Sequence, residues 1–129
     1  MRWSPGSATI SRMRTRVLIV DDHEDFRASA RALLDAEGFA VVGEAADGIG
    51  AIAAVDRLRP DVVLLDVQLP DLDGFAVAER LADAPNPPRV VLISSRDASA
   101  YGPRLQAARA HGFLPKRELS GASLAALVA

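Results

Sequence analysis

Short apolar runs rich in β-branched residues alternate with stretches of helical periodicity from Arg16 onward. In the first of these stretches Phe26, Ala30, Leu33 and Leu34 recur at helical spacing. The runs predict strands over 16–20, 39–45, 61–65, 89–93 and 112–115, and the periodic stretches predict helices over 24–37, 48–58, 74–82, 103–110 and 120–129. This alternation predicts an α/β fold with a parallel sheet that is covered by helices on both faces.

The length of 129 residues, half of them apolar, is sufficient for one domain with a single core. We expect this domain to occupy residues 15–129. Residues 1–14 contain several arginines interrupted by Ser, Pro and Gly, and they lack the apolar run of a signal peptide. Two interpretations stay open for them: a disordered basic leader, or a biological start at Met13.

Charge and composition exclude several classes of function. The formal net charge is -2, which gives no basic face, so we expect no direct binding of nucleic acid by this chain. The chain has no cysteine, which excludes disulfides and zinc–thiolate sites and is compatible with a reducing cytoplasm. No apolar run approaches the roughly 20 residues that span a bilayer, so we expect no membrane insertion.

Polar side chains stand where four of the predicted strands end. Asp21 and Asp22 follow the first strand, Asp66 the third, Ser94 the fourth and Lys116 the fifth. Parallel strands place their carboxyl ends along one edge of the sheet, which is where open α/β folds bind ligands. The sequence therefore predicts a cluster of three carboxylates, one hydroxyl and one ammonium group.

Carboxylates crowded together repel each other unless a cation joins them. Mg²⁺ is the natural candidate, because it is a hard cation that takes oxygen ligands from carboxylates, waters and phosphate. Lys116 can neutralise Asp66 and later hold a phosphoryl oxygen, and Ser94 can donate to another such oxygen. These groups suit phosphoryl transfer to a carboxylate nucleophile, which yields an acyl phosphate on Asp66.

Four motifs together resemble the receiver domains of two-component response regulators. They are Val-Leu-Ile-Val-Asp21-Asp22-His23, the stretch from Asp61 through Asp66 and Pro70 to Gly74, Leu-Ile-Ser94-Ser95, and Gly112-Phe113-Leu-Pro-Lys116. The resemblance covers the chain from about Arg16 to its end. It implies a flavodoxin-like, doubly wound fold with five parallel strands in the order 2-1-3-4-5.

The resemblance also implies a role for each matching residue. Asp66 would accept a phosphoryl group from a sensor histidine kinase or a phosphotransfer protein. Asp22, Asp66 and the backbone carbonyl of Gln68 would bind Mg²⁺ directly, and Asp21 would act through water. Ser94 would turn toward the phosphoryl group and Phe113 would rotate inward.

That rotation would remodel the surface made by the fourth helix, the fifth strand and the fifth helix, which is also the surface of a possible homodimer. The family implies a cytoplasmic phosphoacceptor that is not an enzyme beyond its own phosphorylation and dephosphorylation. In one departure from the family, where Lys-Pro is frequent, Pro115 precedes Lys116 and Arg117 follows it.

Three alternatives compete with a phosphorylated receiver. A phosphatase of the haloacid-dehalogenase type needs an acid two residues after the nucleophile, where this chain has Gln68. A phosphorylation-independent interaction module would typically lack one of the aspartates or the lysine, all of which are present. The third alternative is a fragment of a transcriptional response regulator, in which another segment supplies the contact with DNA.

Overall fold

The computed structural model describes residues 14–128, and residues 1–13 and 129 lie outside the described part. The two interpretations of residues 1–14 therefore concern residues that, apart from Arg14, are not described. The guanidinium of Arg14 donates to the carbonyls of Gly38 and Phe39, at 3.2 and 2.9 Å.

Five parallel strands form the sheet, in the spatial order β2-β1-β3-β4-β5. This confirms the predicted flavodoxin-like order. The strands are β1 (Arg16–Val20), β2 (Ala40–Ala45), β3 (Val62–Asp66), β4 (Arg89–Ser94) and β5 (Gly112–Pro115). The order reverses after β1, so the first and third strands are neighbours and their carboxyl ends lie side by side.

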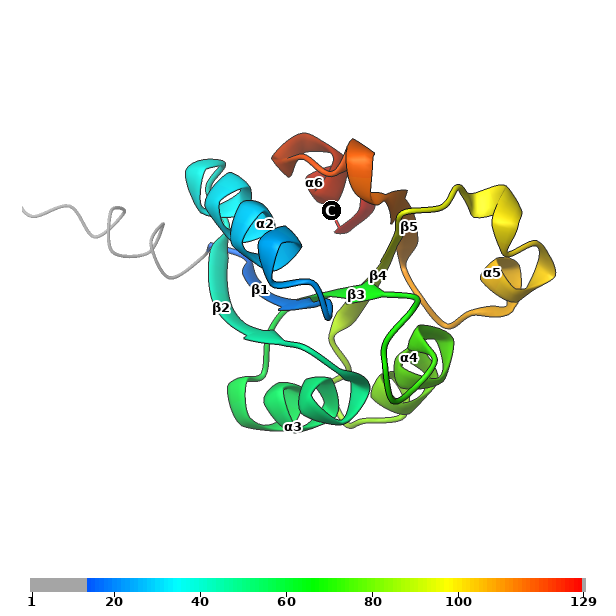
Figure 1. Ribbon diagram of the computed structural model, residues 1–129. Coiled ribbons are helices and arrows are strands. Elements are labelled where there is room, and N and C mark those ends of the chain that lie inside the picture. The colour runs from blue at the N-terminus through cyan, green and yellow to red at the C-terminus, as the bar shows by residue number, and fades with distance from the viewer. Residues whose placement is uncertain (1–13, 129) are drawn as a thin grey trace, which may run out of the picture.

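Helices cover both faces of the sheet, as Figure 1 shows. They are α2 (Glu24–Ala36), α3 (Gly48–Leu58), α4 (Gly74–Ala82), α5 (Pro103–Ala107) and α6 (Gly121–Val128). Successive strand residues point to opposite faces. In β3, Val63 and Leu65 pack with α3 and α4, whereas Val62 and Leu64 pack with α2 and α6. Burial on both faces explains why the central strands are apolar throughout.

Several element ends differ from the sequence prediction. The predicted helix 103–110 ends at Ala107, because Ala108 adopts an extended conformation and the N–H of His111 already donates to Val90 O in the sheet, at 2.7 Å. The last helix begins at Gly121 and not at Ser120. Ser120 instead caps it, accepting the N–H of Ser123 on Oγ at 2.9 Å.

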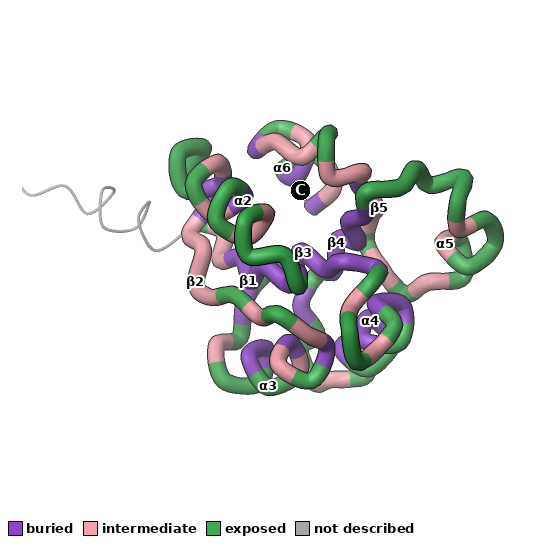
Figure 2. Tube along the Cα trace, viewed as in Figure 1, coloured by how far each residue is buried: buried purple, intermediate pink, exposed green. Residues whose placement is uncertain are grey.

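The helix α5 is held differently from the other helices. It contributes no buried residue, whereas α4 buries Phe75, Val77, Ala78 and Leu81 among others. Figure 2 shows the contrast between the buried central strands and the mostly exposed path that leads from β4 into α5. Within residues 14–128, no helix has the length and apolar character that a membrane crossing requires.

Candidate functional site

Asp21 and Asp66 lie at the carboxyl ends of the adjacent strands β1 and β3. The N–H of Asp21 donates to Ala45 O at 3.0 Å, which extends the ladder between β1 and β2 by one residue. Asp66 is the last residue of β3 and pairs with Ile93 of β4. Both carboxylates are buried, because the sheet and its loops hold them from several sides. The local fold thus brings two acidic groups into one small space.

Lys116 supplies a positive charge to both carboxylates. Its Nζ lies 2.5 Å from Asp21 Oδ2 and 3.2 Å from Asp66 Oδ2. The ring of Phe26 from α2 covers the ammonium group, with Nζ 4.7 Å from the ring centroid. Lys116 begins the short 3₁₀ helix η2 (Lys116–Glu118), directly after β5. The strand order explains how a residue fifty positions beyond Asp66 reaches it.

Asp22 and His23 complete the acidic cluster. The ligand atoms of Asp21, Asp22, His23 and Asp66 all lie within 4.8 Å of one another. His23 donates its backbone N–H to Asp21 Oδ1 at 2.8 Å, and its Nδ1 lies 3.2 Å from Asp22 Oδ1. The sequence prediction included the three aspartates but gave His23 no role in the cluster.

Burial and neighbouring charges shift the pKa values of the two buried carboxylates, Asp21 and Asp66, in opposite directions. Burial and the charge of Asp21 raise the pKa of Asp66 to about 6, against the N–H of Gln68 and the ammonium of Lys116. Burial also opposes ionisation of Asp21, but the pKa of Asp21 is lowered because Lys116 and the N–H of His23 outweigh that cost. The pKa of Lys116 is raised because its two carboxylate partners outweigh its own burial. Of the two buried carboxylates, Asp66 is therefore the one that more readily holds a proton.

The donor set fits a hard divalent cation. All four possible ligands are oxygen or imidazole groups, and three of them are carboxylates. Asp21 Oδ2 is fully buried, and the ammonium of Lys116 lies 2.5 Å from it. A cation would also offset the burial cost that raises the pKa of Asp66.

The loop between β3 and α4, residues 67–73, is tied to the surrounding helices. Asp71 accepts the N–H groups of Gly48 and Ile49 at the start of α3, at 2.7 and 2.9 Å, and these bonds lower its pKa. Asp73 caps α4 by accepting the N–H of Phe75 at 2.7 Å. The N–H of Gln68 donates to Asp66 Oδ1 at 3.1 Å, so the backbone of Gln68 lies beside the Asp66 carboxylate.

Ser94 ends β4 and is buried. Its Oγ accepts the N–H of Arg96 at 3.0 Å and shares a hydrogen bond with the hydroxyl of Tyr101. The ring of Tyr101 contacts the rings of Phe75 and Phe113 edge-on, with centroids 5.7 and 5.9 Å apart. Phe113 is thus one ring removed from Ser94. The sequence prediction omitted Tyr101, for which the chain offers only the signal that it is the sole tyrosine.

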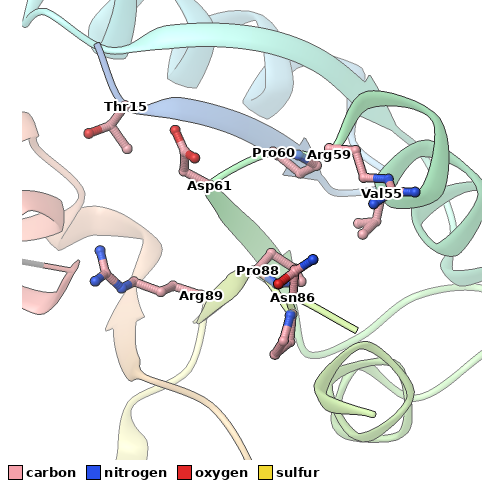
Figure 3. A pocket seen from close by; sticks show the side chains of 9 residues that line it. Thr15, Val55, Arg59, Pro60, Asp61, Asn86, Pro88 and Arg89 are labelled. Atoms are coloured by element: carbon pink, nitrogen blue, oxygen red, sulfur yellow. The ribbon is translucent and has the colours of Figure 1, made fainter. Parts of the chain in front are cut away.

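A cavity lies at the other edge of the sheet. It has a volume of about 620 Å³ and is lined by residues 59–61 and 86–89 with Thr15 and Val55, near the amino ends of β3 and β4. Figure 3 shows Arg59 and Arg89 on opposite sides of it. Its lining residues do not include the acidic cluster, so this cavity and the cluster are separate features of the fold.

Comparison with known proteins establishes the family. A family model described as the response regulator receiver domain matches residues 17–128. The chain belongs to this family, whose members are signalling domains of two-component systems.

Individual relatives agree with this assignment. The chain is 37% identical over 106 residues to BvgA of Bordetella pertussis, covering 82% of this chain and 51% of BvgA. It is 36% identical over 114 residues to the response regulator GacA of Pseudomonas viridiflava, covering 88% and 51%. The chain thus spans about half the length, or less, of the curated relatives it matches.

Solved receiver structures have the same fold. The signal receiver domain of NarL from Mycobacterium tuberculosis superposes with a TM-score of 0.79 at 35% identity, covering 88% of this chain and 96% of that one. The response regulator domain of CheB from Thermotoga maritima gives 0.77 at 25% identity, covering 88% and 93%. These similarities confirm the predicted family and fold class.

Proposed function

We propose that this chain is a phosphoacceptor that receives a phosphoryl group on Asp66 from a phosphohistidine of a sensor kinase or a phosphotransfer protein. The observation that carries the proposal is the position of the Asp66 carboxylate, which is buried at a strand end within the acidic cluster and lies 3.2 Å from the ammonium of Lys116. Such an oxygen can act as a nucleophile once cations neutralise the surrounding charge. As in its family, we expect the chain to act in the cytoplasm.

Mg²⁺ fits the acidic cluster better than the softer metals do, because carboxylate oxygens dominate the donor set. In the proposed arrangement Asp22, Asp66 and the Gln68 carbonyl hold the ion, and Asp21 acts through water. When bound, the ion would neutralise charge on the phosphoryl oxygens. The role of the chain itself is then to hold the Asp66 carboxylate in position for attack.

The proposed step exchanges one bond to phosphorus for another. An oxygen of Asp66 attacks the phosphorus atom, the P–N bond to the donor histidine breaks, and its electron pair stays on the imidazole nitrogen, which takes a proton from solvent. Lys116 then leaves the Asp66 carboxylate oxygen and pairs with a phosphoryl oxygen. Ser94 turns to donate its hydroxyl to another phosphoryl oxygen.

The test is to incubate the protein with acetyl phosphate and Mg²⁺ and to measure its intact mass. We expect the native chain to gain one phosphoryl group and Asp66→Asn to gain none. Asp56→Asn is a matched control, because Asp56 is an exposed acid on α3 outside the cluster, and it should be labelled like the native chain. Labelling of Asp66→Asn, or an unlabelled native chain, would refute the proposal.

A second candidate is control of transcription through a DNA-binding domain. It is supported by the length of the relatives, among them the DNA-binding transcriptional activator EvgA of Escherichia coli, which is 31% identical over 112 residues with 55% of its length covered. We propose that phosphorylation changes the surface of α5, β5 and α6, which could also form a homodimer. The complete reading frame and sedimentation of the phosphorylated chain would test these two points.

Two competing functions have distinct outcomes. A phosphatase of the haloacid-dehalogenase type would turn over aryl phosphates faster than its acyl phosphate decays, and the amide of Gln68 cannot supply the proton that this reaction needs. A phosphorylation-independent module would bind its partner equally well as native chain and as Asp66→Asn. We expect neither result.

A further inference from the structure

We propose that Tyr101 is a positioning residue for the phosphorylation site: its hydroxyl holds Ser94 in the unphosphorylated chain and is released when Ser94 turns to the phosphoryl group. This inference rests on the proposed function of Asp66. It assigns to Tyr101 the direct link with Ser94 that the family resemblance assigns to Phe113, and it names the path by which the site would reach α5.

The first support is the set of hydrogen bonds at Ser94. A serine hydroxyl has one proton and two lone pairs. One lone pair accepts the N–H of Arg96 at 3.0 Å, and the hydroxyl of Tyr101 takes a second position. Ser94 is buried, so water does not readily replace the tyrosine as its partner. If the hydroxyl turns away toward a phosphoryl oxygen, it must leave Tyr101.

The second support is the direction in which Ser94 would have to turn. Asp66 pairs with Ile93, one residue before Ser94 on the neighbouring strand, so the phosphoryl group would lie beside the end of β4. Tyr101 reaches Ser94 from the segment after β4, with its ring between Phe75 of α4 and Phe113 of β5. The phosphoryl group and Tyr101 therefore compete for the same short side chain.

The third support is the weak attachment of the segment that carries Tyr101. Residues 95–100 and 102–104 are exposed, and Tyr101 is the half-buried residue between them. The 3₁₀ helix η1 (Ala98–Ala100) and α5 on either side of it contribute no buried residue. Besides the packing of Tyr101 and Leu105 against the core and the Arg104–Asp73 ion pair, the hydrogen bond at Tyr101 helps to hold this segment, and its loss would loosen the start of α5.

Phe113 cannot take the place of Tyr101 in this link. It has no hydroxyl, so it makes no hydrogen bond with Ser94, and its ring contacts the ring of Tyr101 edge-on. An inward movement of Phe113 would therefore change its contact with Tyr101. The side chain that responds directly to Ser94 is therefore Tyr101.

The decisive experiment is a double-mutant cycle with beryllofluoride, a stable mimic of the phosphoryl group, in the presence of Mg²⁺. Tyr101→Phe keeps the ring and removes only the competing hydroxyl, so we expect beryllofluoride to bind about twofold to tenfold more tightly, the effect of one neutral hydrogen bond. Ser94→Ala should weaken binding. In the Ser94→Ala background, Tyr101→Phe should change nothing, because the shared partner is gone.

A second measurement needs no substitution at Tyr101. Because the chain has one tyrosine, ¹³C-labelled tyrosine gives a single set of ring signals in an NMR spectrum. We expect these signals to shift when beryllofluoride binds the native chain and to shift much less in Ser94→Ala. This readout reports the environment of the ring and is insensitive to a general loss of stability.

The outcomes separate this inference from the proposed function. If beryllofluoride binds neither the native chain nor Asp66→Asn, the proposed function itself fails. If it binds the native chain at Asp66 but Tyr101→Phe binds no more tightly, or gains equally with and without Ser94, the role of Tyr101 is refuted while the function stands. Tyrosine signals that do not respond to beryllofluoride would also refute it.

Discussion

Asp21 and Asp66 lie at the ends of strands that are buried on both faces, whereas Tyr101 lies in a segment in which the residues on either side of it are exposed. The carboxylates are held by backbone ladders and by Lys116, so their positions follow from the sheet itself. The segment after β4 is held by side chains: Tyr101 on Ser94 and Arg104 on Asp73 and Phe75.

Under the proposed function, this difference would assign the chemistry and the response to different parts of the domain. Nucleophilic attack needs groups fixed within a fraction of an ångström, which rigid central strands provide. A switch needs an element with low stability, which a helix without buried residues provides. Substitutions on the rigid side should therefore cost more stability than substitutions on the loosely held side.

The largest effect is expected at Lys116. Lys116→Met leaves the buried carboxylates of Asp21 and Asp66 without their cation, and we expect a loss of about 3–5 kcal/mol in the free energy of unfolding without Mg²⁺. Mg²⁺ should restore part of it. Urea unfolding measures both values, and Arg117→Met, which removes an exposed neighbouring cation, should cost under about 0.5 kcal/mol. Equal losses for the two variants would contradict the buried ion pair.

Gly74→Ala is expected to have the next largest effect on stability. A Cβ at this first residue of α4 would collide with the backbone carbonyl of Asp66 and lie 2.7 Å from Cα of Val67. Backbone cannot move aside as a flexible side chain can, so we expect a loss of about 1–3 kcal/mol and slower labelling by acetyl phosphate. Ala76→Ser, at an exposed position of the same helix, is the control. Unchanged stability would show that the loop between β3 and α4 can move to accept the added methyl group without cost.

The pKa of Asp66 predicts a pH-dependent effect of intermediate size. Because this pKa is raised to about 6, the folded chain holds a proton that the unfolded chain has lost, and its stability falls as the pH rises from about 4 to 6. Asp66→Asn removes the buried charge, so without Mg²⁺ it should gain about 1–3 kcal/mol at pH 7–8.

That gain should shrink as the pH falls toward 4, where the native carboxyl is itself neutral. Thermal unfolding in a metal chelator at a series of pH values measures it. Asp56→Asn is again the control, because this carboxyl is exposed and lies outside the cluster. A gain that grows on acidification would reverse the sign and exclude the burial argument.

The smallest effect is expected on the loosely held side. Arg104→Gln removes the ion pair with Asp73 and the stacking on Phe75, where the guanidinium lies 4.4 Å from the ring centroid. Both partners of the ion pair are exposed, so we expect a loss below about 1 kcal/mol in global stability. Hydrogen exchange over residues 98–108 should nevertheless accelerate, whereas Gln106→Ala on the same helix should leave it unchanged. Unaltered exchange would show that Arg104 does not hold α5.

Prediction from the sequence was most successful where backbone periodicity carries the information. The central strands, their parallel direction and the gathering of Asp21, Asp66 and Lys116 at one edge all follow from apolar runs and from the residues at their ends. The strand order itself was implied only by the resemblance to receiver domains. It was less successful for the helix 103–110, which ends at Ala107. An exposed helix has no strong apolar face to mark its end, and the pairing of His111 with β4 stops it earlier.

The amino-acid sequence by itself determined the sheet and the edge at which the charged groups meet, because strand direction places every carboxyl end together. Only the tertiary structure decided the side-chain contacts around this edge: Phe26 over Lys116, Asp71 on the start of α3, and Tyr101 on Ser94. These contacts join residues on different elements, and their formation depends on side-chain length and direction once the elements have packed, which no periodic pattern along the chain encodes.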